Sequence, residues 1–303
     1  MDYIVKARGL CKSYGHFKAL SDFSINVPKG AVYGFVGKNG AGKTTFIRIL
    51  CGLQKPSAGE YFIYGTSGTS PGIGRVRRRM GAVVETPSLY MSMSAEDNLK
   101  TQYRLLGMPS FKTIPELLSL VGLENTGRKK AKNFSLGMKQ RLGIAMALAQ
   151  NPDLLVLDEP VNGLDPQGIV EIRELILKLN REKQITVLIS SHILDELSRL
   201  ATHYGFIDKG RMVKEISAAE LEAACRKCVR VRVSDIKALA GILHEKNLPY
   251  EIISDTEADI FERVNVSELA VLCGRRGCEI LSMTEREESL ESYYVNLVGG
   301  DEK

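Results

Sequence analysis

Short apolar segments alternate with helical patterns over the first two thirds of the chain. Three of these segments read AVYGFVG, LLVLD and ITVLISS, at residues 31–37, 154–158 and 185–191, and each is followed by a helical pattern. Strands without alternating polar positions are typical of a parallel sheet that is covered by helices on both faces. The pattern over about residues 1–210 therefore predicts an α/β fold built on a parallel sheet.

A block of helical patterns interrupts this alternation between the segments GAVVE and LLVLD. Its first helix is expected to begin at Ser94, which is followed by Asp97 three positions later and so resembles a capping box. The segments TIPELLSLVGL and SLGMKQRLGIAMALAQ continue the helical pattern up to Gln150. We therefore predict a helical subdomain, about residues 92–150, inserted into the sheet domain.

The pattern changes from about Ser217 onward. Strand-like and helical segments follow in the order βαββαβ, which is the order of a ferredoxin-like domain. The strands are expected at residues 228–234, 250–254, 259–264 and 278–284, the two intervening helices at 235–247 and 267–276, and a closing helix at 289–298. The sequence thus predicts two domains, residues 1–216 and a small α+β domain of residues 217–303.

The composition is that of an ordinary globular protein. The 303 residues are 44% hydrophobic and 25% charged. The longest apolar runs are far shorter than the about 20 residues that a membrane-spanning helix needs, and the first residues, MDYIVKARGL, lack the layout of a secretory signal. We therefore expect a cytoplasmic protein that acts at a membrane only through a partner.

Charge is distributed unevenly along the chain. Residues 1–210 hold 28 Lys and Arg against 18 Asp and Glu, whereas residues 211–303 hold 13 against 18. A basic surface is compatible with binding to nucleic acid, to a membrane surface or simply to a nucleotide. The basic runs Arg75–Arg79 and Arg128–Lys132 are expected to be solvated surface, with contact to lipid headgroups or to a partner as the alternative.

Four of the six cysteines lie in the predicted C-terminal domain. Cys225 and Cys228 form a CxxC pair, and four residues separate Cys273 from Cys278. Zinc binding by all four thiolates is one interpretation. The second spacing is loose and each pair adjoins a strand-like segment, so we favour reduced, packed thiols.

A glycine-rich segment, GKNGAGKTT, matches the pattern G-x-x-x-x-G-K-[ST]. It follows a predicted strand and opens a predicted helix, the context that a phosphate-binding loop requires. Its glycines let backbone N–H groups face the phosphates, Lys43 can reach the β- and γ-phosphates, and the Thr44 hydroxyl can ligate Mg²⁺. This context disfavours the alternative of a plain glycine-rich turn. The predicted nucleotide-binding residues are Gly37, Lys38, Asn39, Gly40, Ala41, Gly42, Lys43, Thr44 and Thr45.

Two acidic residues and a histidine follow the next two apolar segments. LLVLD ends in Asp158, which is placed to hold Mg²⁺, and the adjacent Glu159 can orient or deprotonate an attacking water. His192 follows ITVLISS, at the sheet edge where ligands bind in open α/β folds, and can donate a hydrogen bond to a γ-phosphate oxygen. Solvated acids and a structural histidine are the alternatives at these positions.

Taken together, these motifs resemble the ATP-binding cassette (ABC) ATPase family over about residues 3–215. The motifs stand in a specific order: KSYG with Tyr14, the glycine-rich loop, FSLGM at residues 134–138, LLVLDEP, NGLDP at residues 162–166, and SSH. The resemblance implies a P-loop NTPase sheet with an additional antiparallel β subdomain. It also implies stacking of adenine on Tyr14, and ATP and Mg²⁺ as cofactors.

Only one phosphate loop and one FSLGM signature occur in the sequence. The resemblance implies that these motifs meet across a head-to-tail pair of ATPase subunits, so the expected partner is a second copy of the chain. Ser135 and the N–H of Gly137, at the start of a helix, would then contact the γ-phosphate bound by the partner's Lys43. ATP would favour this closed pair and hydrolysis would release it.

Two features depart from the family pattern. Leu136 and Met138 replace a commoner Gly and Gln of the signature, which keeps backbone contacts but removes a polar side chain. Glu85 stands where most relatives carry a glutamine that contacts Mg²⁺ and water. The glutamate could still ligate Mg²⁺ or accept a proton from water. The signature and Glu85 together resemble the branch of exporters for bacitracin and lantibiotic-type peptides.

The resemblance therefore implies the ATPase subunit of an ABC transporter that powers export of an antimicrobial peptide or a drug. Such a subunit would act with separately encoded transmembrane permease subunits and lie on the inner face of the cell membrane. No nucleic-acid partner is expected. Two alternatives stay open: a soluble ABC ATPase of translation or DNA repair, and a regulatory or immunity module in which the C-terminal domain senses a ligand.

Overall fold

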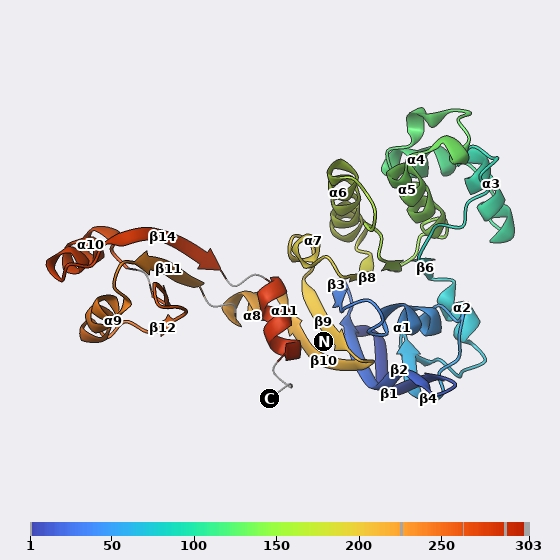
Figure 1. Ribbon diagram of the computed structural model, residues 1–303. Coiled ribbons are helices and arrows are strands. Elements are labelled where there is room, and N and C mark those ends of the chain that lie inside the picture. The colour runs from blue at the N-terminus through green and yellow to red at the C-terminus, as the bar shows by residue number, and fades with distance from the viewer. Residues whose placement is uncertain (1, 225–226, 263, 288–289, 300–303) are drawn as a thin grey trace. The chain divides into compact units, whose positions relative to one another are not determined.

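The computed structural model describes residues 2–224, 227–262, 264–287 and 290–299 (Figure 1). The chain divides into two compact units, Met1–Ala218 and Ala219–Lys303. Each unit has a hydrophobic core of its own.

A six-stranded sheet in the order β10-β9-β3-β8-β7-β6 forms the centre of the first unit. The strands from β9 to β6 are parallel, and β10 pairs antiparallel with β9 at one edge. β3, β7 and β8 are buried along their whole length, as expected for parallel strands with both faces covered. The strands are β3 (Val32–Val36), β6 (Met80–Val83), β7 (Leu154–Asp158), β8 (Thr186–Ser191), β9 (His203–Asp208) and β10 (Arg211–Ser217).

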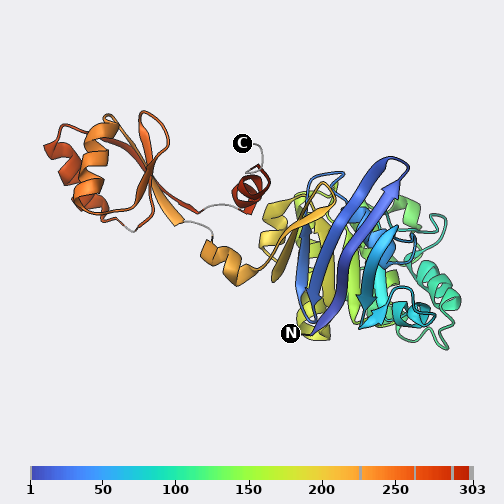
Figure 2. The same cartoon turned by 90° about the horizontal axis from the view of Figure 1, so that it is seen from below.

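A second, antiparallel sheet in the order β2-β1-β4-β5 belongs to the same unit. Figure 2 shows its long strands β1 and β2 side by side, with β4 next to β1. This sheet confirms the antiparallel β subdomain that the resemblance implied. Its strands are β1 (Tyr3–Tyr14), β2 (Phe17–Pro28), β4 (Ala58–Ile63) and β5 (Thr66–Ser67).

Helix α1 (Lys43–Leu50) contributes to a hydrophobic core that contains residues of both sheets. Phe23 of β2, Phe35 of β3 and Phe46 of α1 are fully buried, with ring centroids 5.7, 4.9 and 5.8 Å apart in tilted or edge-on pairs. Such pairs add to the gain from burial alone. Because α1 begins at the glycine-rich loop, this core fixes the helix that carries Lys43.

An inserted helical subdomain lies between β6 and β7, as predicted. Its first helix is capped by Ser94, whose hydroxyl oxygen accepts a hydrogen bond from the Asp97 N–H (3.1 Å). The Ser94 hydroxyl also donates to the Asp97 carboxylate (2.7 Å), which confirms the predicted helix start. The elements are α3 (Ala95–Leu105), α4 (Ile114–Leu120), the 3₁₀ turns η1 (Glu124–Thr126) and η2 (Ala131–Asn133), and α5 (Leu136–Ala147).

Helices follow β7 and β8, as the pattern predicts. α6 (Pro166–Lys183) has Asp165 as its N-cap, and this carboxylate accepts a hydrogen bond from the Gly168 N–H (3.1 Å). α7 (Leu194–Ser198) follows β8, and α8 (Ala218–Ala224) follows β10.

The basic run Arg75–Arg79 overlaps α2 (Ile73–Arg77), and the expectation that the run is solvated surface is wrong for Arg77. Arg77 is half-buried, and its guanidinium donates to the Leu50 carbonyl oxygen (3.0 Å) and to the Tyr61 hydroxyl (2.6 Å). The last carbonyl groups of a helix lack intrahelical donors. Arg77 therefore caps the C-terminal end of α1.

The second unit contains an antiparallel sheet in the order β12-β13-β11-β14. This order confirms the predicted ferredoxin-like arrangement. The third strand begins two residues before its predicted start, because the hairpin closes tightly with the Ile253 N–H donating to the Glu257 carbonyl oxygen (2.9 Å). The elements are β11 (Lys227–Val233), α9 (Ile236–Glu245), β12 (Tyr250–Ile252), β13 (Glu257–Ile260), α10 (Val266–Arg275), β14 (Ile280–Glu287) and α11 (Leu290–Gly299).

Two of the four C-terminal cysteines are buried in the core of the second unit. The side chains of Cys273 and Cys278 pack in this core, which agrees with the packed-thiol interpretation for this pair. Burial raises the pKa of the Cys273 thiol to about 11. Cys228 is half-buried, and Cys225 lies outside the described residues.

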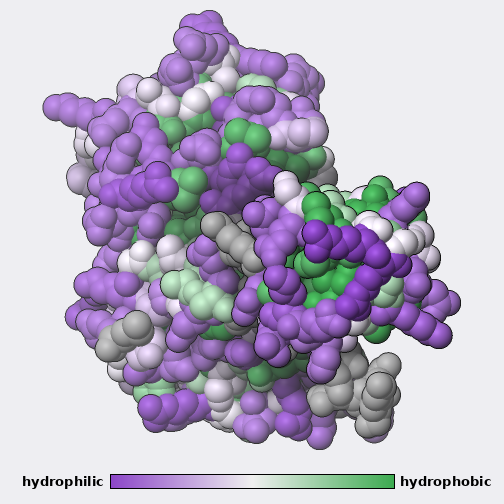
Figure 3. Space-filling model, turned by 90° about the vertical axis from the view of Figure 1, so that its left-hand side faces the viewer, coloured by the Kyte–Doolittle hydropathy of each residue, from purple (hydrophilic) through white to green (hydrophobic). Residues whose placement is uncertain are grey.

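No helix in the described part of the chain is both long enough and apolar enough to cross a membrane. The surface that faces the viewer in Figure 3 is mainly hydrophilic, with smaller hydrophobic areas. Exposed apolar side chains of the second unit include Val266 and Val271 of α10.

Replacing Phe46 with alanine should lower the free energy of unfolding of the first unit by about 3–5 kcal/mol, because it leaves a cavity in the aromatic core. Urea unfolding followed by circular dichroism would measure the loss. Phe17→Ala is the matched control, because this ring is 62% exposed and its removal should cost less than about 0.5 kcal/mol. Equal losses in the two variants would contradict the assignment of Phe46 to the core.

Candidate nucleotide-binding site

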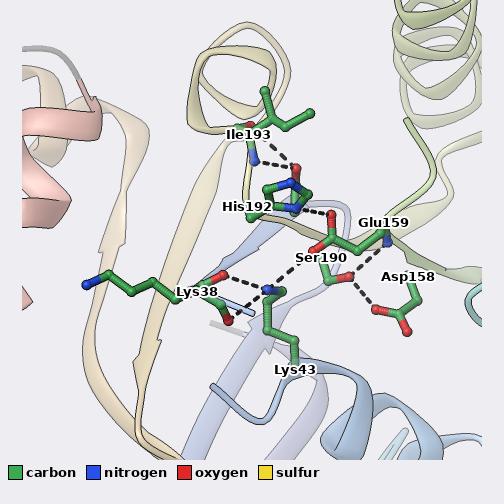
Figure 4. Close-up of polar contacts among 9 residues, drawn as sticks. Lys38, Lys43, Asp158, Glu159, Ser190, His192 and Ile193 are labelled. Carbon is green, nitrogen blue, oxygen red and sulfur yellow. Dashed lines mark hydrogen bonds and ion pairs between the residues drawn. The ribbon is translucent and has the colours of Figure 1, made fainter. Parts of the chain in front are cut away.

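The predicted site residues meet at one edge of the six-stranded sheet. β3, β8 and β7 are neighbouring parallel strands, so their carboxyl ends lie side by side. The glycine-rich loop follows β3, Asp158 ends β7, and His192 follows β8. Figure 4 shows side chains from these three segments pointing toward one another.

The glycine-rich loop depends on its glycines. Gly42 precedes α1 with a left-handed φ of 113°, which side chains rarely adopt. A Cβ added to Gly37 would lie only 2.6 Å from the Ile207 carbonyl oxygen, so this position requires glycine. Among the described residues, no side chain caps the first turn of α1. The N–H groups of that turn can therefore bind an anion.

Lys43 is the buried cation of the site. Only 5% of the residue is exposed, and its ammonium group donates to the carbonyl oxygens of Gly37 (2.5 Å) and Lys38 (3.3 Å). It also lies 3.3 Å from a carboxylate oxygen of Glu159 (Figure 4). The side chain therefore bends back over the loop. The loop carbonyl oxygens accept the N–H groups of the Lys43 ammonium that phosphate oxygens would otherwise accept.

Glu159 connects Lys43 to His192. Its second carboxylate oxygen lies 2.8 Å from His192 Nδ1. The residue has a left-handed φ of 50°, a strained conformation that costs about 1–3 kcal/mol in a non-glycine residue. Two hydrogen bonds from the Glu159 N–H to Ser190 hold it there: 3.0 Å to the hydroxyl oxygen and 3.2 Å to the carbonyl oxygen.

Asp158 is a buried carboxylate with one satisfied oxygen. Its Oδ1 accepts a hydrogen bond from the Ser190 hydroxyl (2.6 Å). Burial raises the pKa of the Asp158 carboxyl, and the charges of Glu159 and Glu85 raise it further. The nearby hydroxyls of Ser190 and Thr44 act in the opposite sense but do not cancel the rise in pKa.

The donor groups at this position fit Mg²⁺. Asp158 Oδ2 is buried and makes no hydrogen bond within the described structure. Carboxylate and hydroxyl oxygens are suitable Mg²⁺ ligands, and Thr44 lines the same cleft as Asp158. The described residues contain no cluster of three or more His, Cys, Asp or Glu side chains that could hold a metal ion by itself. Mg²⁺ commonly binds through one or two carboxylates together with phosphates and waters.

Ser190 is a site residue to which the sequence reasoning assigned no role. It lies on β8 directly opposite Asp158 of β7 in the parallel register. Its hydroxyl therefore donates to Asp158 and accepts from the Glu159 N–H at the same time. The available signal was a pair of serines at the end of an otherwise apolar strand.

Glu85 lies in the loop after β6 and lines a cleft of about 420 Å³ together with Thr44, Asp158 and Glu159. Its φ of 59° is also left-handed. Its carboxylate forms an ion pair with Arg48 of α1 at 2.5 Å, a contact that the sequence did not indicate. The cleft is therefore lined by three acidic side chains, those of Glu85, Asp158 and Glu159.

The signature residues stand at the start of α5. The Ser135 hydroxyl oxygen is the N-cap and accepts a hydrogen bond from the Met138 N–H (3.2 Å). Leu136 is 46% exposed and lines the acidic cleft of its own chain, whereas Ser135 and Gly137 are not among the described residues that line it. Tyr14 is exposed at the end of β1. The single chain thus does not bring Ser135 and Gly137 into the cleft.

Comparison with known proteins identifies the family. The ABC transporter family profile matches residues 20–162. The chain is 41% identical to the bacitracin transport ATP-binding protein BcrA of Bacillus licheniformis, with 99% of each chain covered. The protein belongs to the ABC transporter family. It is also 46% identical to the lantibiotic transport ATP-binding protein SrtF of Streptococcus pyogenes, over 70% of this chain and 90% of that protein.

Solved ABC structures agree with the fold. CbiO1 of Clostridium perfringens, part of the CbiONQ transporter complex, has a TM-score of 0.66 and 29% identity over 74% of this chain and 92% of that one. A dimeric ATP-binding cassette in a post-hydrolysis state with ADP and phosphate has a TM-score of 0.63 and 26% identity, over 71% and 98% of the two chains. The predicted ABC ATPase fold and ATP-hydrolysing activity are confirmed, as is the resemblance to the bacitracin and lantibiotic branch.

Replacing Ser190 with alanine should lower the ATPase turnover number by about 10- to 100-fold, because it removes hydrogen bonds to the buried Asp158 and to the Glu159 backbone. Steady-state phosphate release would measure the effect. Ser191→Ala is the control, since within the described contacts that hydroxyl bonds only to Ile193, accepting from its N–H (2.9 Å) and donating to its carbonyl oxygen (3.4 Å). A Ser190→Ala enzyme as fast as the wild type would contradict this role.

Proposed function

We propose that this ABC ATPase powers the export of a peptide antibiotic through separate permease subunits. The observation that carries the proposal is full-length similarity to two proteins named for bacitracin transport, from Bacillus licheniformis (41% identical) and Enterococcus faecalis (37%). Each match covers 99% of this chain, so it includes the second unit as well as the ATPase. ATP-binding subunits of ABC transporters act with membrane permease components. For this protein, separately encoded permease subunits would hold it at the inner face of the cell membrane.

We propose that the two predicted domains have separate roles. Residues 1–216 would form the ATP-binding domain, with the helical subdomain at about residues 92–150. Residues 217–303 would form an accessory domain. The compact units Met1–Ala218 and Ala219–Lys303 support this division.

ATP would bind with its phosphates in the loop of residues 37–45 and its adenine against the exposed ring of Tyr14. The loop N–H groups and the uncapped first turn of α1 support the phosphate position. Lys43 would exchange its contacts with the loop carbonyls for contacts with the β- and γ-phosphates. This exchange keeps the buried ammonium group hydrogen-bonded in both states.

Mg²⁺ would be held by Thr44, Asp158 and Glu85 together with the phosphates. The buried, unpaired Oδ2 of Asp158 supports this assignment. When bound, the ion supplies positive charge to the β- and γ-phosphate oxygens. The protein's own contribution is to fix the Asp158 carboxylate through Ser190 so that this oxygen faces the cleft.

Glu159 would act as the general base for the attacking water, with His192 as its partner. The 2.8 Å contact between the two side chains supports these roles. A protonated His192 can donate Nδ1–H to Glu159 and Nε2–H to a γ-phosphate oxygen. Glu85, across the same cleft, can accept a proton from water or ligate Mg²⁺.

Two copies of the chain would pair head-to-tail, so that each α5 completes the site of the other subunit. The exposed start of α5, where Ser135 and Leu136 reach the surface, supports this pairing. The similarity to a cassette solved as a dimer with ADP and phosphate supports it further. Ser135 and the Gly137 N–H would then contact the γ-phosphate on the partner subunit.

Replacing Glu159 with glutamine should leave ATP binding intact but reduce hydrolysis by more than about 100-fold, because the amide cannot take a proton from water. The ATP-bound dimer should then accumulate, measured by size-exclusion chromatography with light scattering. Glu174→Gln is the control, because the Glu174 side chain of α6 is 66% exposed, and this variant should hydrolyse ATP at the normal rate. An unchanged hydrolysis rate in Glu159→Gln would refute the assignment of the base.

Expression of the protein with its permease should protect a sensitive bacterial host against bacitracin or a related peptide antibiotic. Lys43→Ala should abolish this protection, because the buried ammonium group is lost from the phosphate loop. Growth inhibition assays over a panel of peptide antibiotics would measure it. Protection that is the same with Lys43→Ala would overturn the proposed coupling of ATP to export.

A further inference from the structure

The ion pair between Arg48 and Glu85 is a feature of the cleft that the roles above leave unexplained. Arg48 Nη2 lies 2.5 Å from Glu85 Oε1. The two side chains are 36% and 56% exposed, so both can exchange this contact for another. The pair joins α1, which carries the phosphate loop, to the loop that follows β6.

Arg48 stands at a position from which it can influence the metal site. It lies four residues after Thr44 on α1, so the two side chains share one face of the helix. Thr44 and Glu85 both line the acidic cleft.

The backbone at Glu85 is held in a strained state. Its left-handed φ of 59° matches that of Glu159 in the same cleft, and strain of this kind concentrates at functional sites. Pro87, two residues later, packs against α5, where a Cβ added to Gly143 would approach it to 2.6 Å. The Glu85 loop is therefore packed on the signature helix at one end and tied to α1 by Arg48 at the other.

A purely structural role for Arg48 would be to complement the C-terminal end of the α1 dipole. That end already has a specific partner, because the Arg77 guanidinium donates to the Leu50 carbonyl oxygen and lies 3.5 Å from the Ile49 carbonyl oxygen. In the described structure, the Arg48 guanidinium instead donates to the Glu85 carboxylate.

We propose that Arg48 is a positioning residue that holds the Glu85 carboxylate against α1 and competes with the divalent cation for it. The proposal rests on the proposed binding of Mg²⁺ and ATP in this cleft. One carboxylate oxygen that is paired with a guanidinium is less available to a metal ion, so the ion pair weakens cation binding until nucleotide and metal together displace it. Because exposed ion pairs are weak, the effect should be modest.

The test is a double-mutant cycle on the Glu159→Gln background, where hydrolysis does not interfere. The affinity for a fluorescent ATP analogue is measured in EDTA and in saturating Mg²⁺, and the ratio of the two dissociation constants gives the gain due to the metal. Arg48→Gln should raise this gain about two- to fivefold. Glu85→Gln should lower the gain due to the metal. In the Glu85→Gln protein, adding Arg48→Gln should change this gain by less than half of the factor that Arg48→Gln causes when Glu85 is present.

Two controls separate this role from a general effect of α1. Arg48→Lys keeps the charge and should resemble the parent. Arg77→Gln removes the cap of α1 and should lower the thermal unfolding temperature. Its effect on the gain due to the metal should be the same whether residue 85 is Glu or Gln.

The outcomes separate the two proposals. A parent protein that binds no ATP analogue with Mg²⁺ would refute the proposed nucleotide site itself. A parent that binds normally, with an Arg48→Gln effect that is absent or equal in both backgrounds, would refute the role of Arg48 alone.

Discussion

Parallel pairing of β3, β8 and β7 is the constraint on which the site depends, because it brings the ends of three distant segments to one edge. The register matters as much as the order. Ser190 lies directly opposite Asp158, so its hydroxyl reaches the carboxylate while it also accepts from the Glu159 N–H. A slip of one residue in β8 would turn the Ser190 side chain to the other face of the sheet and remove both contacts.

Two of the three acidic side chains of the cleft form ion pairs within the protein. Lys43 lies against Glu159, and Arg48 lies against Glu85. Asp158 keeps one buried oxygen without a hydrogen bond in the described structure, which makes it the carboxylate best prepared for a cation. Binding of a nucleotide would therefore replace these internal contacts with contacts to the ligand. Both glutamates have a left-handed backbone, a strained conformation of the kind that clusters at functional sites.

Membership of the ABC family agrees with the position of Ser135 and Gly137, which do not line the cleft of their own chain in the described structure. α5 begins with an exposed serine and leucine, and the similar cassette with ADP and phosphate is a dimer. The second unit has its own core and sheet, and it is part of the match to the bacitracin transport proteins. A ferredoxin-like fold alone does not define its role, because this fold serves many functions.

The sequence by itself determined the local parts of this protein: the glycine-rich loop with Lys43, the acids at the end of an apolar strand, the Ser94 cap and the βαββαβ order of the tail. Each is written in adjacent residues and in the period of apolar positions, because turns, caps and strands obey local rules. The roles of Ser190, Arg48 and Arg77 were decided only by the tertiary structure. Their partners come from other strands and helices, and such contacts depend on sheet order, register and helix packing, which no local pattern records.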